Sequence, residues 1–174
     1  MVFFLIKIFI FLEILFVFWN LSLILSYYKG APFSRSKKER IDTMLKLAEI
    51  KPGKVIVDLG SGDGVLIREA AKRGAKAIGV EINPFLVLYS KLKIFQQGLN
   101  KNCKVIWGDL FHYPLDKANV VFIYLFPKTV EKLKEKFIKE LKPGAFIISN
   151  GFPIPEWKIE KKENKVFLYK IEEV

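Results

Sequence analysis

A stretch of ten residues in the first half of the chain constrains the fold more than any other feature. It runs from Val55 to Gly64 and reads Val-Ile-Val-Asp-Leu-Gly-Ser-Gly-Asp-Gly. The apolar residues are typical of a buried strand, and the glycines allow the sharp turn that leads from a strand into a helix. A helix pattern follows at Val65–Arg73, and a second strand pattern ends in Glu81. This order is typical of a parallel sheet that binds a nucleoside-containing cofactor at one edge.

Strand and helix patterns alternate through the middle of the chain. The strand patterns are Lys54–Asp58, Ala77–Glu81, Cys103–Trp107, Val120–Tyr124 and Ala145–Asn150. One helix pattern begins at Ser36, and three more occupy Val65–Arg73, Pro84–Gln97 and Thr129–Leu141. The strands are continuous apolar runs, as expected when helices cover both faces of a sheet. The alternation predicts an α/β fold with a doubly wound, mostly parallel, Rossmann-like sheet.

The C-terminal part departs from this alternation. Trp157–Lys162 and Lys165–Ile171 both have strand patterns, and Glu163-Asn164 lies between them as a short turn. We expect an antiparallel hairpin that joins the edge of the sheet. With the five earlier strands, the hairpin makes a sheet of seven.

The first 28 residues are almost continuously apolar. Val2–Tyr28 exceeds the roughly 20 apolar residues that cross a bilayer as one helix, whereas a cleaved signal peptide has a shorter apolar core and a small-residue cleavage site. We therefore expect a single-pass membrane anchor over residues 1–29 and a separate domain over residues 30–174. The basic cluster after the helix outweighs the charge before it, which predicts a cytoplasmic domain. That cluster is Lys29, Arg35, Lys37, Lys38 and Arg40.

The linker and the charge of the domain give two further expectations. Ser36 and Glu39, after the linker Gly30–Arg35, have the spacing of a capping box that starts a helix.

The formal net charge is +11, and almost all of it lies in the domain. A basic domain favours lipid head groups, nucleic acid or acidic protein surfaces, although abundant lysine and glutamate are also typical of heat-adapted proteins.

The spacing of the glycines distinguishes two classes of cofactor. Dinucleotide loops read G-x-G-x-x-G, which would require glycine at position 65, where this chain has Val65. Gly60, Gly62 and Gly64 instead have the spacing G-x-G-x-G, and Asp58 precedes them. This arrangement favours S-adenosylmethionine, because the amino group of its methionine part needs a nearby acid.

Two further acids are expected at the same edge of the sheet. Glu81 ends the second strand and can accept hydrogen bonds from both ribose hydroxyls. Asp109 follows the third strand and can accept a hydrogen bond from the adenine amino group. The alternative interpretation is that the glycines only form a tight turn and the acids only cap helices. It explains the pattern poorly, because three acids at one edge would repel one another without a ligand. One cysteine, Cys103, and one histidine, His112, provide neither a disulfide nor a metal site.

These residues resemble the seven-strand methyltransferases that use S-adenosylmethionine, over roughly residues 30 to 174. Within this group, the chain resembles the membrane-anchored protein-lysine methyltransferases. Their relatives act on ATP synthase subunit c and on the adenine nucleotide translocase, and they include a broad-specificity archaeal enzyme. The resemblance rests on the anchor and on Pro32-Phe33 with Ser36, Asp58–Gly64, Gly79–Asn83, Gly108–Phe111, Tyr124–Pro127 and Phe152–Trp157. It implies that the segment around Phe33 closes over the cofactor. It implies cofactor contacts from Phe33, Asp58, Gly60, Ser61, Gly62, Asp63, Gly64, Glu81, Asn83, Asp109 and Leu110.

The end of the fourth strand predicts the acceptor side of the site. Tyr124–Pro127 would form an apolar wall that lowers the pKa of a substrate lysine, and Tyr124 is the best candidate for a catalytic residue. The Asn/Asp-Pro-Pro-aromatic motif of adenine-N6 enzymes is absent here, which argues against DNA adenine methylation. The expected substrate is a protein with an exposed lysine at a membrane. Methylation of RNA or of a lipid-like small molecule, and a non-catalytic membrane-bound adaptor, are the alternatives.

Overall fold

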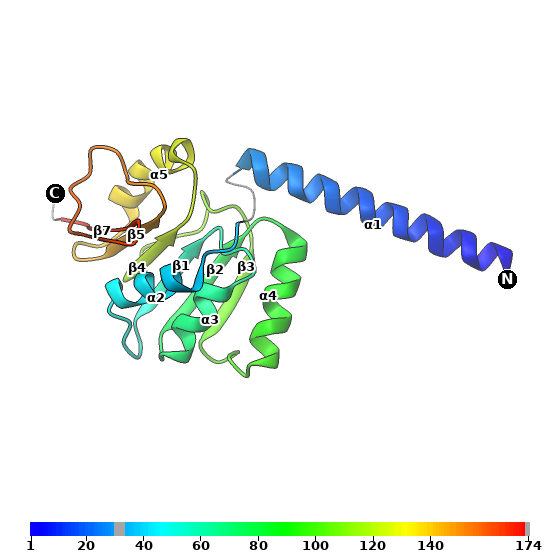
Figure 1. Cartoon of the computed structure of the whole chain (residues 1–174), viewed down its shortest axis with the longest axis horizontal. Helices are drawn as coiled ribbons and strands as arrows, with labels where there is room; N and C mark the ends of the chain where they lie inside the picture. The colour runs from blue at the N-terminus through cyan, green and yellow to red at the C-terminus, as the bar shows by residue number, and fades with distance from the viewer. Residues whose placement is uncertain (30–33, 173–174) are drawn as a thin grey trace.

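A long N-terminal helix and an α/β domain make up the molecule (Figure 1). The computed structural model describes residues 1–29 and 34–172. Helix α1 spans Val2–Lys29, and the domain begins with helix α2. The domain elements are α2 (Lys38–Leu47), β1 (Val55–Leu59), α3 (Val65–Lys72), β2 (Lys76–Glu81), α4 (Pro84–Gln96), β3 (Cys103–Trp107), β4 (Val120–Ile123), α5 (Pro127–Glu140), β5 (Phe146–Asn150), β6 (Lys161–Glu163) and β7 (Val166–Lys170).

The described strands form one seven-stranded sheet in the order β3-β2-β1-β4-β5-β7-β6. Strands β1 to β5 pair in parallel, whereas β7 is antiparallel to both of its neighbours, β5 and β6. The predicted doubly wound sheet with a C-terminal hairpin at its edge is therefore confirmed. The strand order reverses direction between β1 and β4, and ligands bind beyond the carboxyl ends of parallel strands at such a point.

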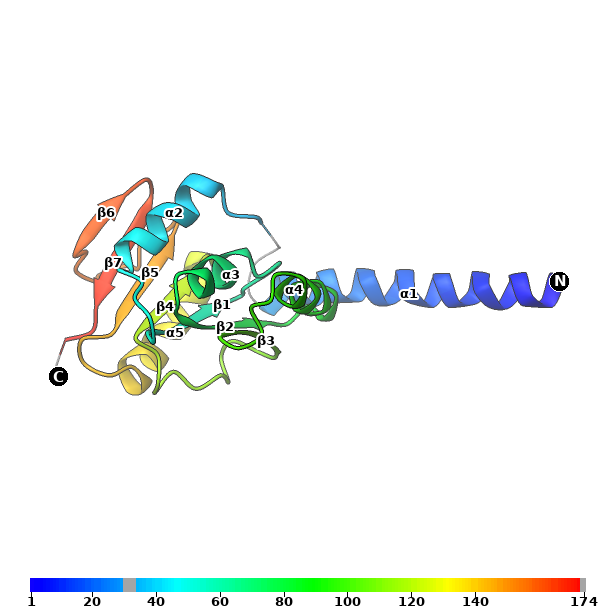
Figure 2. The ribbon, with the colours of Figure 1, turned by 90° about the horizontal axis from the view of Figure 1, so that it is seen from below.

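Helices cover both faces of the sheet (Figure 2). A hydrophobic cluster lies between the helices and the sheet on each face. Helices α2, α3 and α4 pack on one face, where Met44, Ile67 and Val87 join Ile56 of β1. Helix α5 covers the other face, and its fully buried Val130, Leu133 and Phe137 join the cluster that contains Val57. Successive residues of β1 thus enter different clusters, which explains why its sequence shows no polar alternation.

The prediction for the C-terminal hairpin was right in topology and wrong in its first strand. Strand β6 contains only Lys161–Glu163, and Trp157 lies outside it. The Trp157 ring instead contacts the rings of Phe137 and Tyr169, so it fills the core from a loop. The turn is formed by Asn164 and Lys165, one residue later than predicted, and both have positive φ. Positive φ at both central positions is the geometry that suits a two-residue hairpin turn.

The predicted capping box at Ser36 is also wrong. Helix α2 starts later, with Lys37 at the N-cap position and no side-chain cap. The Ser36 hydroxyl accepts a hydrogen bond from Asn150 Nδ2 at 3.0 Å, so it joins the end of β5 rather than capping a helix. Helix α5, predicted from Thr129, begins two residues earlier at Pro127. Proline suits the first position of a helix, because its missing N–H would have no partner there.

Helix α1 extends away from the domain as one continuous element (Figure 1). Its segment Val2–Ser22 is long and apolar enough to cross a membrane, and residues 1–21 are exposed, whereas Ser22 is buried. Trp19 is a point where the helix meets the domain, with its ring 4.9 Å from that of Phe85 between centroids.

Candidate functional site

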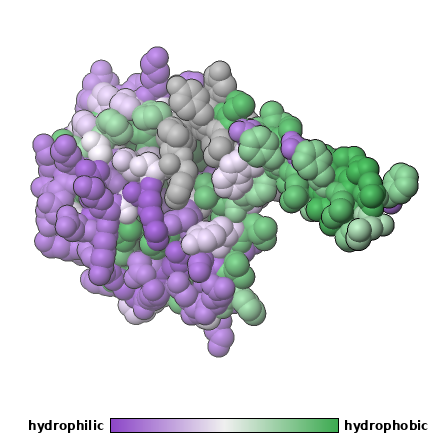
Figure 3. Space-filling view, turned by 45° about the vertical axis from the view of Figure 1, so that its right-hand side comes forward, coloured by the Kyte–Doolittle hydropathy of each residue, from purple (hydrophilic) through white to green (hydrophobic). Residues whose placement is uncertain are grey.

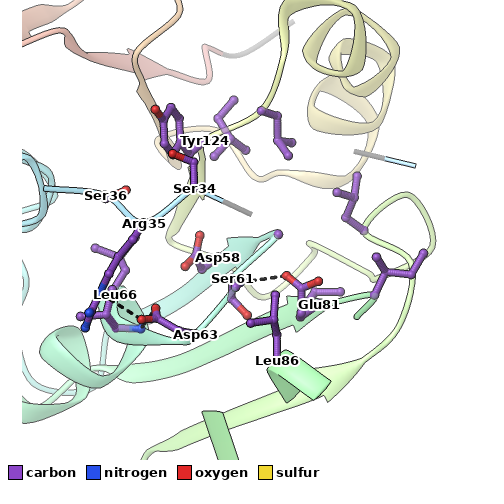
Figure 4. Close-up of a pocket in the computed structure, with 18 of the residues that line it drawn as sticks. Ser34, Arg35, Ser36, Asp58, Ser61, Asp63, Leu66, Glu81, Leu86 and Tyr124 are labelled. Carbon is purple, nitrogen blue, oxygen red and sulfur yellow. Dashed lines mark hydrogen bonds and ion pairs between the residues drawn. The ribbon is translucent and has the colours of Figure 1, made fainter. Parts of the chain in front are cut away.

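A cavity lies at the carboxyl edge of the sheet, where β1, β2 and β4 end (Figure 4). Four acids and one cation are among its lining residues: Asp58, Asp63, Glu81, Asp109 and Arg35. An acidic cavity in a chain of net charge +11 points to a cationic ligand. Other residues that line the cavity are Ser34, Ser36, Gly60, Ser61, Gly62, Ile82, Leu86, Leu110, Tyr124 and Leu125.

The glycine loop is held against β2 at the floor of the cavity. The backbone N–H groups of Gly60 and Ser61 both donate to the carbonyl oxygen of Val80, at 2.9 and 3.0 Å. Gly64 has φ +70°, and a Cβ there would lie 2.0 Å from Ser90 Oγ. Gly64 is not among the cavity residues, so the structure explains its glycine by backbone conformation and by close packing on α4.

Glu81 joins the loop to the start of α4. One carboxylate oxygen accepts from Gly62 N–H and the other from Asn83 N–H, each at 2.8 Å. Each oxygen has a second lone pair that can still accept from a ligand hydroxyl. Asn83 does not line the cavity, and its side chain caps α4 by accepting from the N–H groups of Phe85 and Leu86. Asn83 therefore orients Glu81 through its backbone.

Burial makes two of the acids costly to ionise. The pKa of Asp58 is raised to about 8, first by burial and then by the nearby carboxylates of Glu81 and Asp63. Burial also raises the pKa of Glu81, against the opposing effect of its backbone hydrogen bonds. A cation in the cavity would favour the charged forms of both groups, because opposite charge offsets the loss of hydration.

Ser61 provides a further sign that the cavity takes a ligand. Its hydroxyl oxygen is buried, the residue lines the cavity, and this oxygen has no hydrogen-bond partner in the part of the chain that the structure describes. Gly79 leaves room for this side chain, since a Cβ at Gly79 would lie 2.4 Å from Ser61 Oγ. A buried hydroxyl without a partner costs about 1–3 kcal/mol, which a ligand hydrogen bond would recover.

The segment before α2 covers one side of the cavity, where Arg35 lies beside Asp63 of the glycine loop (Figure 4). Arg35 Nε contacts Asp63 Oδ2 at 3.1 Å, which ties this segment to the loop. Ser36 is fixed from behind by Asn150, whose side-chain oxygen also accepts from Arg40 at 3.3 Å. Phe33, which was expected to close over the cofactor, lies outside the described residues.

The third acid lies where it was predicted, at the end of β3. Asp109 lines the cavity, and its Oδ1 accepts from the Phe111 N–H at 3.0 Å. Leu110, also predicted for the cofactor, is buried and lines the cavity beside it. The side chain of His112 is 84% exposed and 3.8 Å from Asp109 Oδ2, so it points to solvent rather than into the cavity.

The segment that was expected to form an apolar wall divides into separate parts. Tyr124 and Leu125 line the cavity, and Leu125 also belongs to the core. Phe126 does not line the cavity; it is 42% exposed and contacts the ring of Phe152. Pro127 begins α5. Tyr124 thus provides the aromatic side chain at the edge of the cavity (Figure 4).

The residues that form this site lie within a region that matches a known protein family. The profile described as "ANTKMT methyltransferase domain" matches residues 58–161, which include Asp58, Glu81, Asp109 and Tyr124. The chain belongs to this methyltransferase family. The prediction of a seven-strand methyltransferase related to the protein-lysine enzymes is therefore confirmed.

Individual relatives differ in the substrates that their names give. The chain is 33% identical over 159 residues to a protein-lysine N-methyltransferase of Saccharolobus islandicus, covering 86% of this chain and 99% of the relative. It is 33% identical over 126 residues to a human lysine N-methyltransferase named for ATP synthase, covering 72% of this chain. The chain spans only 54% of the length of that human protein. A solved structure described as an RNA methyltransferase of Salinibacter ruber with S-adenosyl-L-homocysteine matches with 31% identity and a TM-score of 0.78. That match covers 81% of this chain and 95% of the other.

The methyltransferase cavity has the properties that S-adenosylmethionine requires. The cofactor carries a positive sulfonium and an amino group, and the cavity offers the buried acids Asp58 and Glu81. The cofactor also carries hydroxyl groups, and the oxygens of Glu81 retain lone pairs that can accept hydrogen bonds from them. Ser61 offers the cofactor a buried hydroxyl that has no hydrogen-bond partner among the described residues. The residues present therefore fit the cofactor of the family.

The resemblance implied that the segment around Phe33 closes over the cofactor, but sequence reasoning did not identify the next residues of that segment, or the residue that supports them, as part of the site. Ser34, Arg35 and Ser36 line the cavity, although they were assigned to a linker and a helix cap. Asn150 was placed at a strand end without a role, yet it is fully buried and holds Ser36. The polar residues next to the linker were the only local sign of this contact.

Proposed function

We propose that this chain is a protein-lysine N-methyltransferase that uses S-adenosylmethionine. The observation that carries the proposal is the match to the Saccharolobus islandicus protein-lysine N-methyltransferase, which extends over almost the whole of that protein. The acidic cofactor cavity at the carboxyl edge of the sheet supports the same assignment. The substrate is a lysine side chain exposed on another protein.

Bound S-adenosylmethionine supplies an electrophilic methyl group to this reaction. The lone pair of the lysine nitrogen forms the new N–C bond while the C–S bond breaks and its electrons stay on sulfur. Only about one lysine in 2,500 is neutral at pH 7, so the proton must leave to solvent before transfer. The protein's contribution is to align the reacting atoms and to keep the amine neutral.

We assign the cofactor contacts as follows. Asp58 receives the amino group of the methionine part, Glu81 receives the ribose hydroxyls, and Asp109 receives the adenine amino group. The loop with Gly60, Ser61, Gly62, Asp63 and Gly64 surrounds the methionine part, while Leu110 contacts the adenine, Asn83 orients Glu81, and Phe33 belongs to the segment that closes over the cofactor.

Tyr124 is the proposed catalytic residue on the acceptor side. It lines the same cavity as the acids and lies directly after β4, at the edge opposite Glu81 (Figure 4). Its ring can hold the lysine side chain, and its neighbour Leu125 keeps that part of the cavity apolar. Desolvation there lowers the pKa of the substrate amine, which increases the neutral fraction.

We further propose that residues 1–29 anchor residues 30–174 to a membrane as a single span with a cytoplasmic domain. The support is the helix Val2–Ser22, whose length and hydropathy suit a bilayer. The substrates would then be membrane proteins or proteins held close to the membrane.

RNA methylation is the second candidate, because the solved structure from Salinibacter ruber is described as an RNA methyltransferase and this chain is strongly basic. The test incubates the full chain and membranes with methyl-labelled S-adenosylmethionine, then treats samples with nuclease, protease or lipid solvent. We expect label that survives nuclease and solvent and is released by protease. Label released by nuclease alone, or extracted with lipid, would refute the lysine proposal.

A further inference from the structure

Helix α4 has two apolar faces, and only one of them is used by the core. Val87, Ser90 and Ile94 are buried against the domain. On the opposite side, Leu88, Leu92 and Phe95 are 68%, 51% and 71% exposed. Their spacing of four and three residues places them on one stripe of the helix.

The exposed stripe lies between lysines. At 100° per residue, Lys91 lies on one side of it, and Lys93 lies on the other with its amine 5.6 Å from the Tyr89 ring centroid. The stretch from Ile82 to Gly108 contains Lys91, Lys93, Lys101 and Lys104 and no acid. An apolar stripe between lysines is typical of a helix that lies in the surface of a bilayer.

The contact between α1 and α4 fixes where this stripe lies relative to the anchor. Trp19 is near the end of the membrane-crossing stretch Val2–Ser22, and its ring lies against Phe85 at the start of α4. Tryptophan concentrates at the boundary between membrane and water. The start of α4 therefore lies at the level where the anchor leaves the bilayer.

The direction of α4 suits this position. Helix α4 runs across the direction of α1 in Figure 1, and in Figure 2 it is seen end-on while α1 lies along the page. Because α1 crosses the membrane, a helix at a wide angle to it lies along the membrane surface. Figure 3 shows hydrophobic residues continuing from the anchor onto the adjacent face of the domain. Trp107, which is 68% exposed, lies at the end of β3, the strand that α4 packs beside.

We propose that the exposed stripe Leu88–Leu92–Phe95 of α4 inserts into the head-group region of a lipid bilayer containing anionic lipids. This inference rests on the proposed membrane anchor. Phe85 contacts Trp19 of the anchor, and the next residue, Leu86, lines the cofactor cavity. The stripe would fix the domain in one orientation, with the mouth of the cavity beside the membrane surface. It would restrict the accessible lysines to those close to the bilayer.

The test uses the full chain with Cys103→Ala and one fluorophore-labelled cysteine, in vesicles of phosphatidylcholine and phosphatidylglycerol with brominated acyl chains. Three positions are matched in exposure: Leu92 at 51%, Ile138 on α5 at 53% and Ile10 in the anchor at 51%. We expect bromine to quench the probe of Leu92→Cys and that of Ile10→Cys, but not that of Ile138→Cys. The Leu92→Cys probe should be quenched most by bromines near the top of the acyl chains, because an interfacial helix buries its apolar face about 5–10 Å into the boundary between head groups and acyl chains.

The three probes separate the possible failures. Quenching at position 10 with none at position 92 would overturn the docking proposal and leave the anchor intact. The absence of quenching at all three positions would overturn the anchor, and the docking with it. A probe at position 92 that is shielded from water but not quenched would also overturn the proposal, because it would indicate a protein partner or a second copy on α4.

Discussion

Lowering the pH from 7 to 6 should weaken cofactor binding about tenfold, because Asp58 must lose a proton to receive the cofactor's amino group. The pKa of Asp58 is about 8 in the free protein. About one molecule in ten then has the ionised carboxylate at pH 7, and about one in a hundred at pH 6. The binding free energy should therefore change by about 1.4 kcal/mol per pH unit in this range. The cofactor's amino group, with an ordinary pKa of about 8, stays protonated over the same range.

Isothermal titration calorimetry with S-adenosylhomocysteine measures this effect directly, since that compound retains the amino group. Repeating the titration in buffers of different ionisation enthalpy counts the protons released, and we expect close to one per binding event. Asp58→Asn keeps the shape of the side chain and removes its titration, so its pH slope should be lost together with much of the affinity at pH 7.

Two results would refute this reasoning. One is a wild-type affinity that does not change between pH 6 and 7. The other is an Asp58→Asn variant that keeps the tenfold slope, which would assign the proton to Glu81, whose pKa is also raised.

Other changes at the site have equally definite outcomes. The Asp58 carboxyl keeps its proton up to about pH 8 in the folded protein, but only up to about pH 4 in the unfolded chain. The free energy of unfolding of the cofactor-free protein should therefore fall by about 1 kcal/mol per pH unit as the pH rises from 5 to 7. Thermal melts should show a smaller loss in Asp58→Asn. Gly64→Ala should cost about 2–4 kcal/mol in urea unfolding from strained φ and the clash with Ser90, and adding Ser90→Ala should recover part of it. A cost below about 1 kcal/mol would contradict the packing. Glu81→Gln should weaken cofactor binding at least tenfold by losing charge-assisted hydrogen bonds, and a calorimetric Kd within a factor of two of wild type would count against the ribose assignment. Tyr124→Ala should lower kcat with little change in the Kd of S-adenosylhomocysteine, whereas an equal loss in both would place Tyr124 on the cofactor side.

The parts of the fold that follow local rules could be predicted from the sequence. Three features were sufficient to predict the sheet and the edge that carries the cavity. They are the apolar run with Asp58 before Gly60, the acids Glu81 and Asp109 at the ends of the next two strands, and the alternation with helices. These features depend on residues close together in the chain, and the parallel topology then brings the three acids to one edge.

The errors arose where distant residues decide the structure. Ser36 fits a local capping pattern, but its hydroxyl instead accepts a hydrogen bond from Asn150, which is 114 residues away in the sequence. Trp157 and Ile154 are apolar residues near a strand-like pattern, yet they fill the core from a loop; the Ile154 N–H donates to the buried Tyr169 hydroxyl at 2.8 Å. A loop that buries apolar residues has the same composition as a strand, so sequence pattern alone could not distinguish them.

The exposed stripe of α4 shows a similar limit. The pattern over Pro84–Gln97 predicts a helix, but it does not indicate which of its apolar residues the sheet covers. Only the structure shows that the sheet covers the other side of α4 and leaves Leu88, Leu92 and Phe95 exposed.

The identity of the methylated atom tests the central claim most directly. The full chain is incubated with methyl-labelled S-adenosylmethionine and membranes, and the recovered protein is hydrolysed to amino acids and separated by chromatography. We predict label in methylated lysine, and its loss when Glu81→Gln replaces the wild-type chain. Label in another amino acid, or label found only in nucleotides or lipids, would contradict the assignment of this chain as a protein-lysine methyltransferase.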